Sequence, residues 1–270
     1  MPGKICYLGD DTLQGAAAYL GGIMLHFGHA FDHIPSGQTP PTAFAETPYA
    51  LYIVSDYQAA TFGQVAMTHV AERVAQGAGL AMFGGWESFF GRLGEYQASP
   101  LAEVLPVVMQ QSDDRRNSAQ PCLVNQKADH PILEGLPWDT PPGIGGYNEI
   151  APRPGATTLL TALRFSVHRE TRGTEDVVRK TAAVLHAVSP TTSSAAFRFT
   201  SGEEVPLLVV GQHGRGRVAA LATDVAPHWV GGMVDWGDRR ITQPVGAGFV
   251  EIGNWYAQFF RNLLVWTGNL

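Results

Sequence analysis

The sequence has few cysteines, no surplus of basic residues and no long apolar segment. Its two cysteines, Cys6 and Cys122, lie far apart, so no disulfide framework is expected. Lysine and arginine number 18 against 24 acidic residues, and this balance argues against binding to nucleic-acid phosphates. No stretch approaches the roughly 20 apolar residues of a membrane helix, and no signal-like segment opens the chain. We therefore expect a cytoplasmic protein that binds neither nucleic acid nor membrane.

Length and composition indicate an ordinary globular protein. A chain of 270 residues with 45% hydrophobic and 16% charged residues suits one large α/β domain. No internal repeat, low-complexity tract or linker divides it. We therefore predict a single domain over residues 1–270.

The first third of the chain alternates strand-like and helix-like segments. The apolar strands lack polar alternation and are separated by helices, a pattern typical of a parallel sheet covered on both faces. The predicted strands are 4–10, 30–35, 49–56 and 79–85, and the predicted helices are 12–27 and 64–76.

The rest of the chain is less regular. Residues 205–224 hold two apolar runs joined by a Gly-rich turn, which predicts a β-hairpin. Residues 248–267 carry aromatic and leucine side chains at helical spacing, which predicts a closing amphipathic helix. The segment 129–149 is dense in proline and glycine and is interpreted as an ordered surface loop. Further β character is found at 101–109, 121–126, 157–165, 180–188 and 195–201.

Polar residues collect where the predicted parallel strands end. Ligands of open parallel sheets bind at the carboxyl ends of the strands, so these residues are candidates for a binding site. An aspartate after a strand is also a common cap or turn residue, and this reading stays open for each of them. The candidates are Gly9, Asp10, Asp11, Ser55, Asp56, Gly84, Gly85, Trp86, Glu87, Ser88, Asp224 and His228, with Trp229 as a further ligand contact.

Several motifs in the expected order resemble one known family. They are Gly84–Phe89, Ser99–Pro106, Asp129–Ile132, Gly145–Asn148, Val209–Val218, Thr223–Trp229 and Phe260–Trp266. Together they are similar to the class I glutamine amidotransferase-like family that is related to trehalose-utilisation (ThuA-like) proteins. The resemblance implies a flavodoxin-like, three-layer α/β/α sandwich with a mostly parallel sheet.

The family's glutaminase chemistry needs a cysteine on a Gly-x-Cys-x-Gly elbow, a sharp turn from a strand into a helix. With Gly84 in the first position, Trp86 stands at the cysteine and Ser88 at the last glycine. Tryptophan cannot act as a nucleophile, so glutaminase activity is not expected. The family's general base is a histidine oriented by an acid, and His228 with Asp224 four residues earlier matches that arrangement. Ser88 is the nearest hydroxyl that could serve as a nucleophile with this pair.

No metal or other cofactor is expected. His26, His29 and His33, with Asp32 beside them, are dense enough to suggest metal ligands. A helix end at Gly28 separates the first two, however, and zinc needs three or four converging ligands.

Three functional hypotheses follow. The first is a binding protein that holds a small polar molecule, such as a carbohydrate derivative, against Trp86 and Trp229 at the strand ends. The second is a hydrolase or isomerase in which His228 works with Asp224 or Asp10. The third is a structural subunit of a homo-oligomer.

Overall fold

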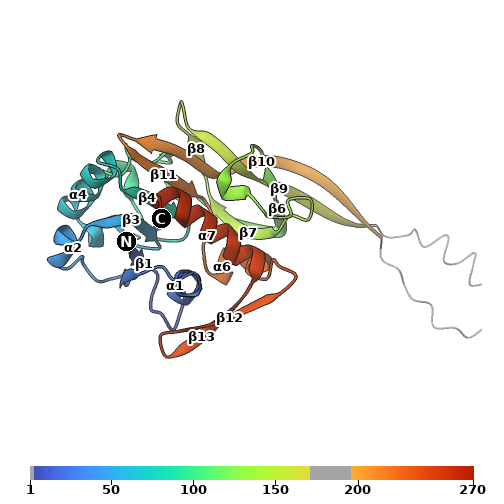
Figure 1. Ribbon diagram of the computed structural model, residues 1–270. Helices are drawn as coiled ribbons and strands as arrows, with labels where there is room; N and C mark the ends of the chain where they lie inside the picture. Colours follow the sequence, from blue (N-terminus) through green and yellow to red (C-terminus); the bar gives the residue numbers. More distant parts are fainter. Residues whose placement is uncertain (1–2, 171–195) are drawn as a thin grey trace, which may run out of the picture.

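The computed structural model describes residues 3–170 and 196–270, and a central nine-stranded sheet dominates it (Figure 1). The strand order is β2-β1-β3-β4-β11-β10-β9-β6-β7. Neighbours from β2 to β11 are parallel, and those from β11 to β7 are antiparallel. The predicted α/β class is confirmed. The expectation of a mostly parallel sheet holds for one half only, because the long segment between β4 and β11 supplies antiparallel strands.

The parallel half contains the strands that were expected from their apolar runs. Consecutive residues in these strands are fully buried on both faces of the sheet, as in Ile5–Leu8 and Leu51–Val54. The strands are β1 (Lys4–Gly9), β2 (Phe31–Ile34), β3 (Tyr49–Ser55), β4 (Gly79–Phe83) and β11 (Gly216–Leu221).

The antiparallel half extends past the main body as a long β-ribbon (Figure 1). Its strands are β6 (Arg115–Gln126), β7 (Gly143–Asn148), β9 (Thr157–Glu170) and β10 (Ala196–His213). The predicted hairpin over 205–224 is confirmed as the end of β10 and the whole of β11. The strand predicted at 180–188 lies outside the described residues.

Two predictions for this half were wrong in part. Residues 129–149 are not a surface loop throughout, because they include β7, where Ile144 and Tyr147 are buried. Of residues 101–109, only β5 (Val107–Met109) is a strand, and it pairs with β8 (Ile150–Pro152) in a small separate sheet.

Helices pack on both faces of the parallel half. Gly79 and Phe83 of β4 face α7 (Asn254–Gly268), and the ring centroids of Phe83 and Phe260 are 5.6 Å apart. Gly216 of β11 points to the opposite face, where α4 (Gln64–Ala75) lies. These contacts make three layers in this part of the molecule. The shorter helices are α2 (Ala43–Glu46), α3 (Ala59–Phe62) and α6 (Pro227–Val230).

The first helix and the closing helix are shorter than predicted. Residues 13–16 form turns, so α1 spans Ala17–His26 instead of 12–27. The predicted helix over 248–267 starts with a strand, β13 (Gly248–Gly253), which pairs with β12 (Arg240–Val245). This hairpin packs on α1, where Gly22 leaves room for Val250.

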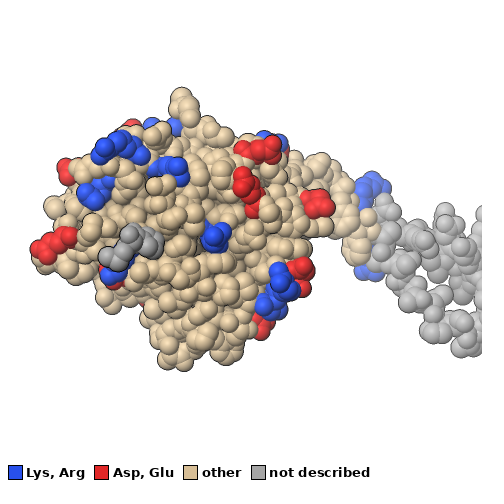
Figure 2. Space-filling view, in the orientation of Figure 1, with Lys and Arg blue, Asp and Glu red and all other residues tan. Residues whose placement is uncertain are grey.

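In the part of the chain that the structure covers, no helix has the length and apolar character needed to cross a bilayer. Lys and Arg are interspersed with Asp and Glu on the face in Figure 2.

The contact between Gly79 and α7 predicts a large cost for a small substitution. A Cβ atom at Gly79 would lie 2.2 Å from the backbone oxygen of Thr267, which cannot move without shifting α7. We expect Gly79→Ala to lower the free energy of unfolding by about 2–3 kcal/mol in urea denaturation. Gly248→Ala is the matched control, since no atom lies within 4 Å of its added Cβ. Equal stability of the two variants would contradict this packing.

Candidate functional site

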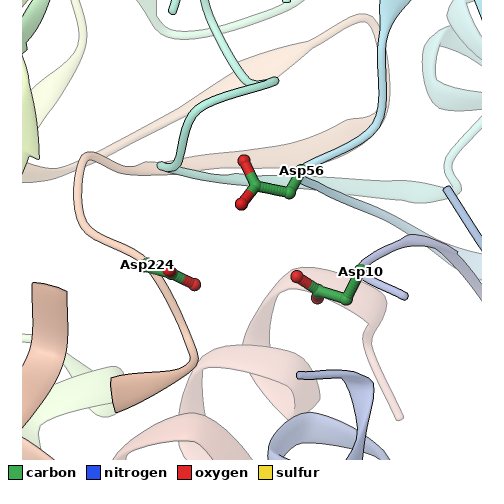
Figure 3. A group of neighbouring side chains, drawn as sticks. All are labelled: Asp10, Asp56 and Asp224. Atoms are coloured by element: carbon green, nitrogen blue, oxygen red, sulfur yellow. The ribbon is translucent and has the colours of Figure 1, made fainter. Parts of the chain in front are cut away.

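Three aspartate side chains meet at the carboxyl ends of three parallel strands. Asp10 follows β1, Asp56 follows β3 and Asp224 lies three residues beyond β11. One carboxylate oxygen of each lies within 4.8 Å of the others, and Figure 3 shows the three side chains pointing toward one another. We call this group the acidic cluster. Its position confirms that the residues chosen at these strand ends come together in space.

The backbone turns sharply at two of the three acids. Asp10 has a φ of 51° and Asp56 a φ of 42°, both in the left-handed region that aspartate tolerates better than most residues. Before Asp10, Gly9 has a φ of 116°, and a Cβ there would lie 1.6 Å from the carbonyl oxygen of Ser55. These turns direct the two carboxylates toward Asp224.

Hydrogen bonds fix each carboxylate in place. The Tyr7 hydroxyl donates to Asp10 Oδ2. Asp56 Oδ1 accepts from the Glu87 N–H at 2.8 Å. Asp224 Oδ1 accepts from the backbone N–H groups of Val225 and Ala226, at 2.6 and 2.9 Å. Asp224 therefore also shapes the turn before α6, although the N-cap residue of that helix is Ala226.

Burial and repulsion from neighbouring carboxylates make Asp10 and Asp56 hard to ionise. Asp10 is 3% exposed and Asp224 is 2% exposed. Burial, followed by the charges of Asp224 and Asp56, holds the pKa of Asp10 well above its ordinary value. Burial, with the charge of Asp224, raises the pKa of Asp56 to about 7. Asp10 and Asp56 therefore bind protons more tightly than ordinary aspartates do.

His228 lies at the exposed side of the cluster. Its Nδ1 is 3.4 Å from Asp224 Oδ2, so the predicted pair is close in space. The interaction with Asp224 raises the pKa of the His228 imidazole above its ordinary value. The ring itself is largely solvent-exposed. This arrangement suits proton exchange between the imidazole and a bound molecule.

The two glycines after β4 pack against the cluster and against β7. A Cβ at Gly85 would lie 2.0 Å from Asp56 Oδ1, so glycine is needed for this approach. The Asn148 side chain accepts from the Gly85 N–H at 2.9 Å and donates to the Gly85 carbonyl at 3.1 Å. It also donates to Asp114 Oδ1 at 2.8 Å. This pair of polar residues anchors the loop beside Asp56.

Asn148 and Asp114 were not among the predicted site residues. Asp114 accepts hydrogen bonds from Phe90 N–H and Gly91 N–H, so it holds the same loop further along. Asn148 does belong to one of the motifs used for the resemblance. Because the sequence predicts a surface loop around Asn148, its contacts with the Gly85 loop were not expected.

Trp86 and Glu87 lie on the exposed side of that loop. The Trp86 side chain is 49% exposed, and the Arg115 guanidinium lies 4.4 Å from its ring centroid. Glu87 accepts a hydrogen bond of 2.7 Å from the Gln58 side chain. Trp86 can therefore contact a ligand, although Arg115 already occupies one of its faces.

The comparisons with known proteins agree with this architecture. Residues 32–198 match a family model described as "Putative glutamine amidotransferase". The chain belongs to this family. Its relationship to ThuA-like proteins stays a prediction. A search of the curated proteins finds no significant match.

Two solved structures have the same fold as this glutamine amidotransferase-like protein. They are described as "Cytoplasmic Protein STM3548 from Salmonella typhimurium" and "Cytoplasmic Protein STM1381 from Salmonella typhimurium LT2". Each is 22% identical with a TM-score of 0.68, and the alignments cover 98% of this chain and 98% and 99% of theirs. At this identity the likeness establishes the fold alone.

The elbow expected after β4 lacks its helix. Bends and turns follow from Gly85 to Gly94, and only a short 3₁₀ turn (Tyr96–Ala98) comes after them. The segment is therefore a Gly-rich turn that carries the half-exposed Trp86. Ser88 is fully buried, and its hydroxyl oxygen accepts a hydrogen bond of 3.0 Å from the Asp56 N–H. This placement favours a structural role for Ser88 over a nucleophilic one.

Two other candidates lie outside the acidic cluster. Trp229 is 3% exposed, packs against Gly146 and donates to Asn117 Oδ1 at 2.8 Å, so it does not offer a free face. Asp11 is exposed, and its charge contributes to the raised pKa of His228.

Within the described residues, the histidines near Asp32 do not form a group that could hold a metal. His33 Nε2 lies 2.8 Å from the Gly9 carbonyl oxygen, and the His26 ring packs edge-on against Phe27. The residues that do come together as potential metal ligands are the three aspartates. From the sequence they were expected to bind a small molecule or to act in catalysis, and not to hold a metal.

The raised pKa of Asp56 predicts a pH-dependent effect of its removal. Between about pH 4 and pH 7 the folded state binds the Asp56 proton more tightly than the unfolded state, so its contribution to stability is lost as pH rises. In a buffer that contains a metal chelator, we expect Asp56→Asn to raise the free energy of unfolding by about 1–3 kcal/mol near pH 8. The gain should shrink near pH 5, where wild-type Asp56 is protonated.

Urea denaturation of both proteins at the two pH values measures this effect. Asparagine keeps an oxygen that can accept from the Glu87 N–H, so the substitution mainly removes charge. Asp139→Asn, at an exposed acid, is the control and should change stability by less than about 0.5 kcal/mol. A destabilised Asp56→Asn at the higher pH would contradict the electrostatic account.

Proposed function

We propose that this protein binds a small hydroxyl-rich or cationic molecule at the acidic cluster, without glutaminase activity. The observation that carries the proposal is the convergence of the Asp10, Asp56 and Asp224 carboxylates at the carboxyl edge of the parallel strands. Carboxylates accept hydrogen bonds from hydroxyl groups and attract positive charge. The imidazole of His228 lies beside Asp224, and the half-exposed Trp86 follows Gly85 on the loop next to Asp56.

The surroundings of the cluster suit a small polar ligand. Strand ends at such an edge are a usual binding position in open parallel sheets. Two of the three acids are nearly inaccessible to water, so a ligand that satisfies them gains strength from the low local polarity. A carbohydrate-derived molecule fits these requirements, with Trp86 against its apolar face. The cytoplasmic description of the two structural neighbours is in keeping with a cytoplasmic role.

Both cysteines are unsuited to amide hydrolysis. Cys6 lies inside β1 and Cys122 inside β6, and both are fully buried. Burial raises the pKa of the Cys6 thiol far above its ordinary value, which suppresses the nucleophilic thiolate. The chain has no other cysteine.

The absence of an accessible thiol predicts the outcome of a glutaminase assay. We expect ammonia release from glutamine to equal that of a protein-free blank. Treatment with iodoacetamide should leave the rate unchanged, because neither thiol reaches solvent. Ammonia release that iodoacetamide abolishes would overturn the proposal that this chain lacks glutaminase chemistry.

Ligand binding can be tested by calorimetry with a panel of sugars, sugar acids, polyols and polyamines. We expect at least one compound to bind, and Asp224→Asn to weaken its affinity at least ten-fold through loss of a charge-assisted hydrogen bond. Asparagine can still accept from Val225 and Ala226, so the turn before α6 should persist. The control Asp139→Asn should bind normally. No heat with any compound, or equal binding by Asp224→Asn, would remove the support for this site.

A further inference from the structure

The acidic cluster has few positive groups near it. Among the described residues, the His228 ring is the one basic group whose nitrogen lies within 4 Å of any of the three carboxylates. His228 contacts Asp224 alone. A buried group of like charges is costly unless protons, a metal ion or a charged ligand neutralises it. Protons on Asp10 and Asp56 neutralise part of the charge near neutral pH, and a bound cation would take their place.

Ser55 provides a second, independent indication of a ligand. Its side chain is fully buried at the end of β3, beside Asp56. The hydroxyl faces the Asp10 carboxyl closely enough to lower the pKa of that group, yet it makes no hydrogen bond within the described part of the chain. Buried hydroxyls are normally paired, and an unpaired one beside three carboxylates indicates a missing partner.

The donor atoms define the chemistry of that partner. All three side chains in the cluster offer carboxylate oxygens, and Ser55 adds a hydroxyl oxygen. Oxygen-only sites prefer hard divalent cations, whereas zinc favours histidine and cysteine ligands. Oxygens around one Mg²⁺ lie about 3 Å apart when adjacent and about 4 Å apart when opposite. The three carboxylate oxygens lie within 4.8 Å of one another, so small side-chain rotations would bring them onto one such ion.

We propose that Asp10, Asp56 and Asp224 form a binding site for one divalent cation of the Mg²⁺ or Mn²⁺ type, with the Ser55 hydroxyl facing the bound ion. The inference rests on the proposed function in that both use the same strand ends. The cation would neutralise the three acids and leave coordination positions open toward His228 and Trp86. A small hydroxyl-rich or carboxylate-bearing ligand could then bind to the ion.

Mn²⁺ titration followed by electron paramagnetic resonance tests the site, because protein-bound Mn²⁺ loses the sharp signal of the free ion. We expect the wild-type chain to bind one Mn²⁺ with a dissociation constant below about 1 mM, and Mg²⁺ to displace it. Asp10→Asn and Asp56→Asn should each weaken binding at least ten-fold. Both substitutions remove repulsion in the metal-free protein, so these variants should fold, and circular dichroism checks that they do.

Two further variants make the result decisive. Ser55→Ala keeps every carboxylate and breaks no hydrogen bond, so it should fold and bind Mn²⁺ several-fold more weakly. Asp139→Asn should bind as the wild type does. Absence of a bound Mn²⁺, or undiminished binding in both aspartate variants, would overturn the site. No organic ligand is present in this titration, so its outcome is independent of the sugar and polyol calorimetry.

Discussion

Electrostatic repulsion among Asp10, Asp56 and Asp224 is the constraint around which this end of the molecule is organised. Three acids that follow strands β1, β3 and β11 lie within 4.8 Å of one another, and two are almost fully buried. Such an arrangement costs stability in proportion to the charge that remains uncompensated. Proteins retain costly buried charges chiefly where they bind or react, and this supports the proposed binding site at the cluster.

The rest of the fold holds these acids together. The antiparallel half of the sheet returns to the parallel half at this edge, since the Asn148 N–H donates to the Ala222 carbonyl at 2.7 Å. The Thr223 hydroxyl donates to the Gly146 carbonyl at 2.9 Å. β7 thus closes against the carboxyl end of β11, although it lies at the far edge of the sheet order. Residues distant in sequence thereby fix the loop that carries Gly85 and Trp86.

The sequence predicts the parallel half and the three acids well. Continuous apolar runs such as those of β1 and β3 leave little choice of structure, and the acids follow directly at their ends. It predicts the antiparallel half poorly, because the pairing of β7 depends on partners far along the chain. The burial of Trp229 follows from the missing Cβ of Gly146, which only the folded contact reveals. Ser55 is a strand-end candidate from the sequence, but only the structure shows that its buried hydroxyl is unpaired.

The family description implies cysteine-based glutaminase chemistry, whereas the candidate site consists of carboxylates. Membership rests on residues 32–198, whereas Asp10 and Asp224 lie outside that range. The elbow position holds Trp86 where a nucleophile would be required, and both thiols are buried. The account therefore assigns the function to the carboxylates and not to a cysteine.

The most direct test of this account is a crystal structure grown with Mn²⁺, with anomalous diffraction used to locate the metal. The account predicts one strong anomalous peak among the carboxylates of Asp10, Asp56 and Asp224, within reach of the Ser55 hydroxyl. A map without a peak at the acidic cluster, at a Mn²⁺ concentration of several millimolar, would contradict it.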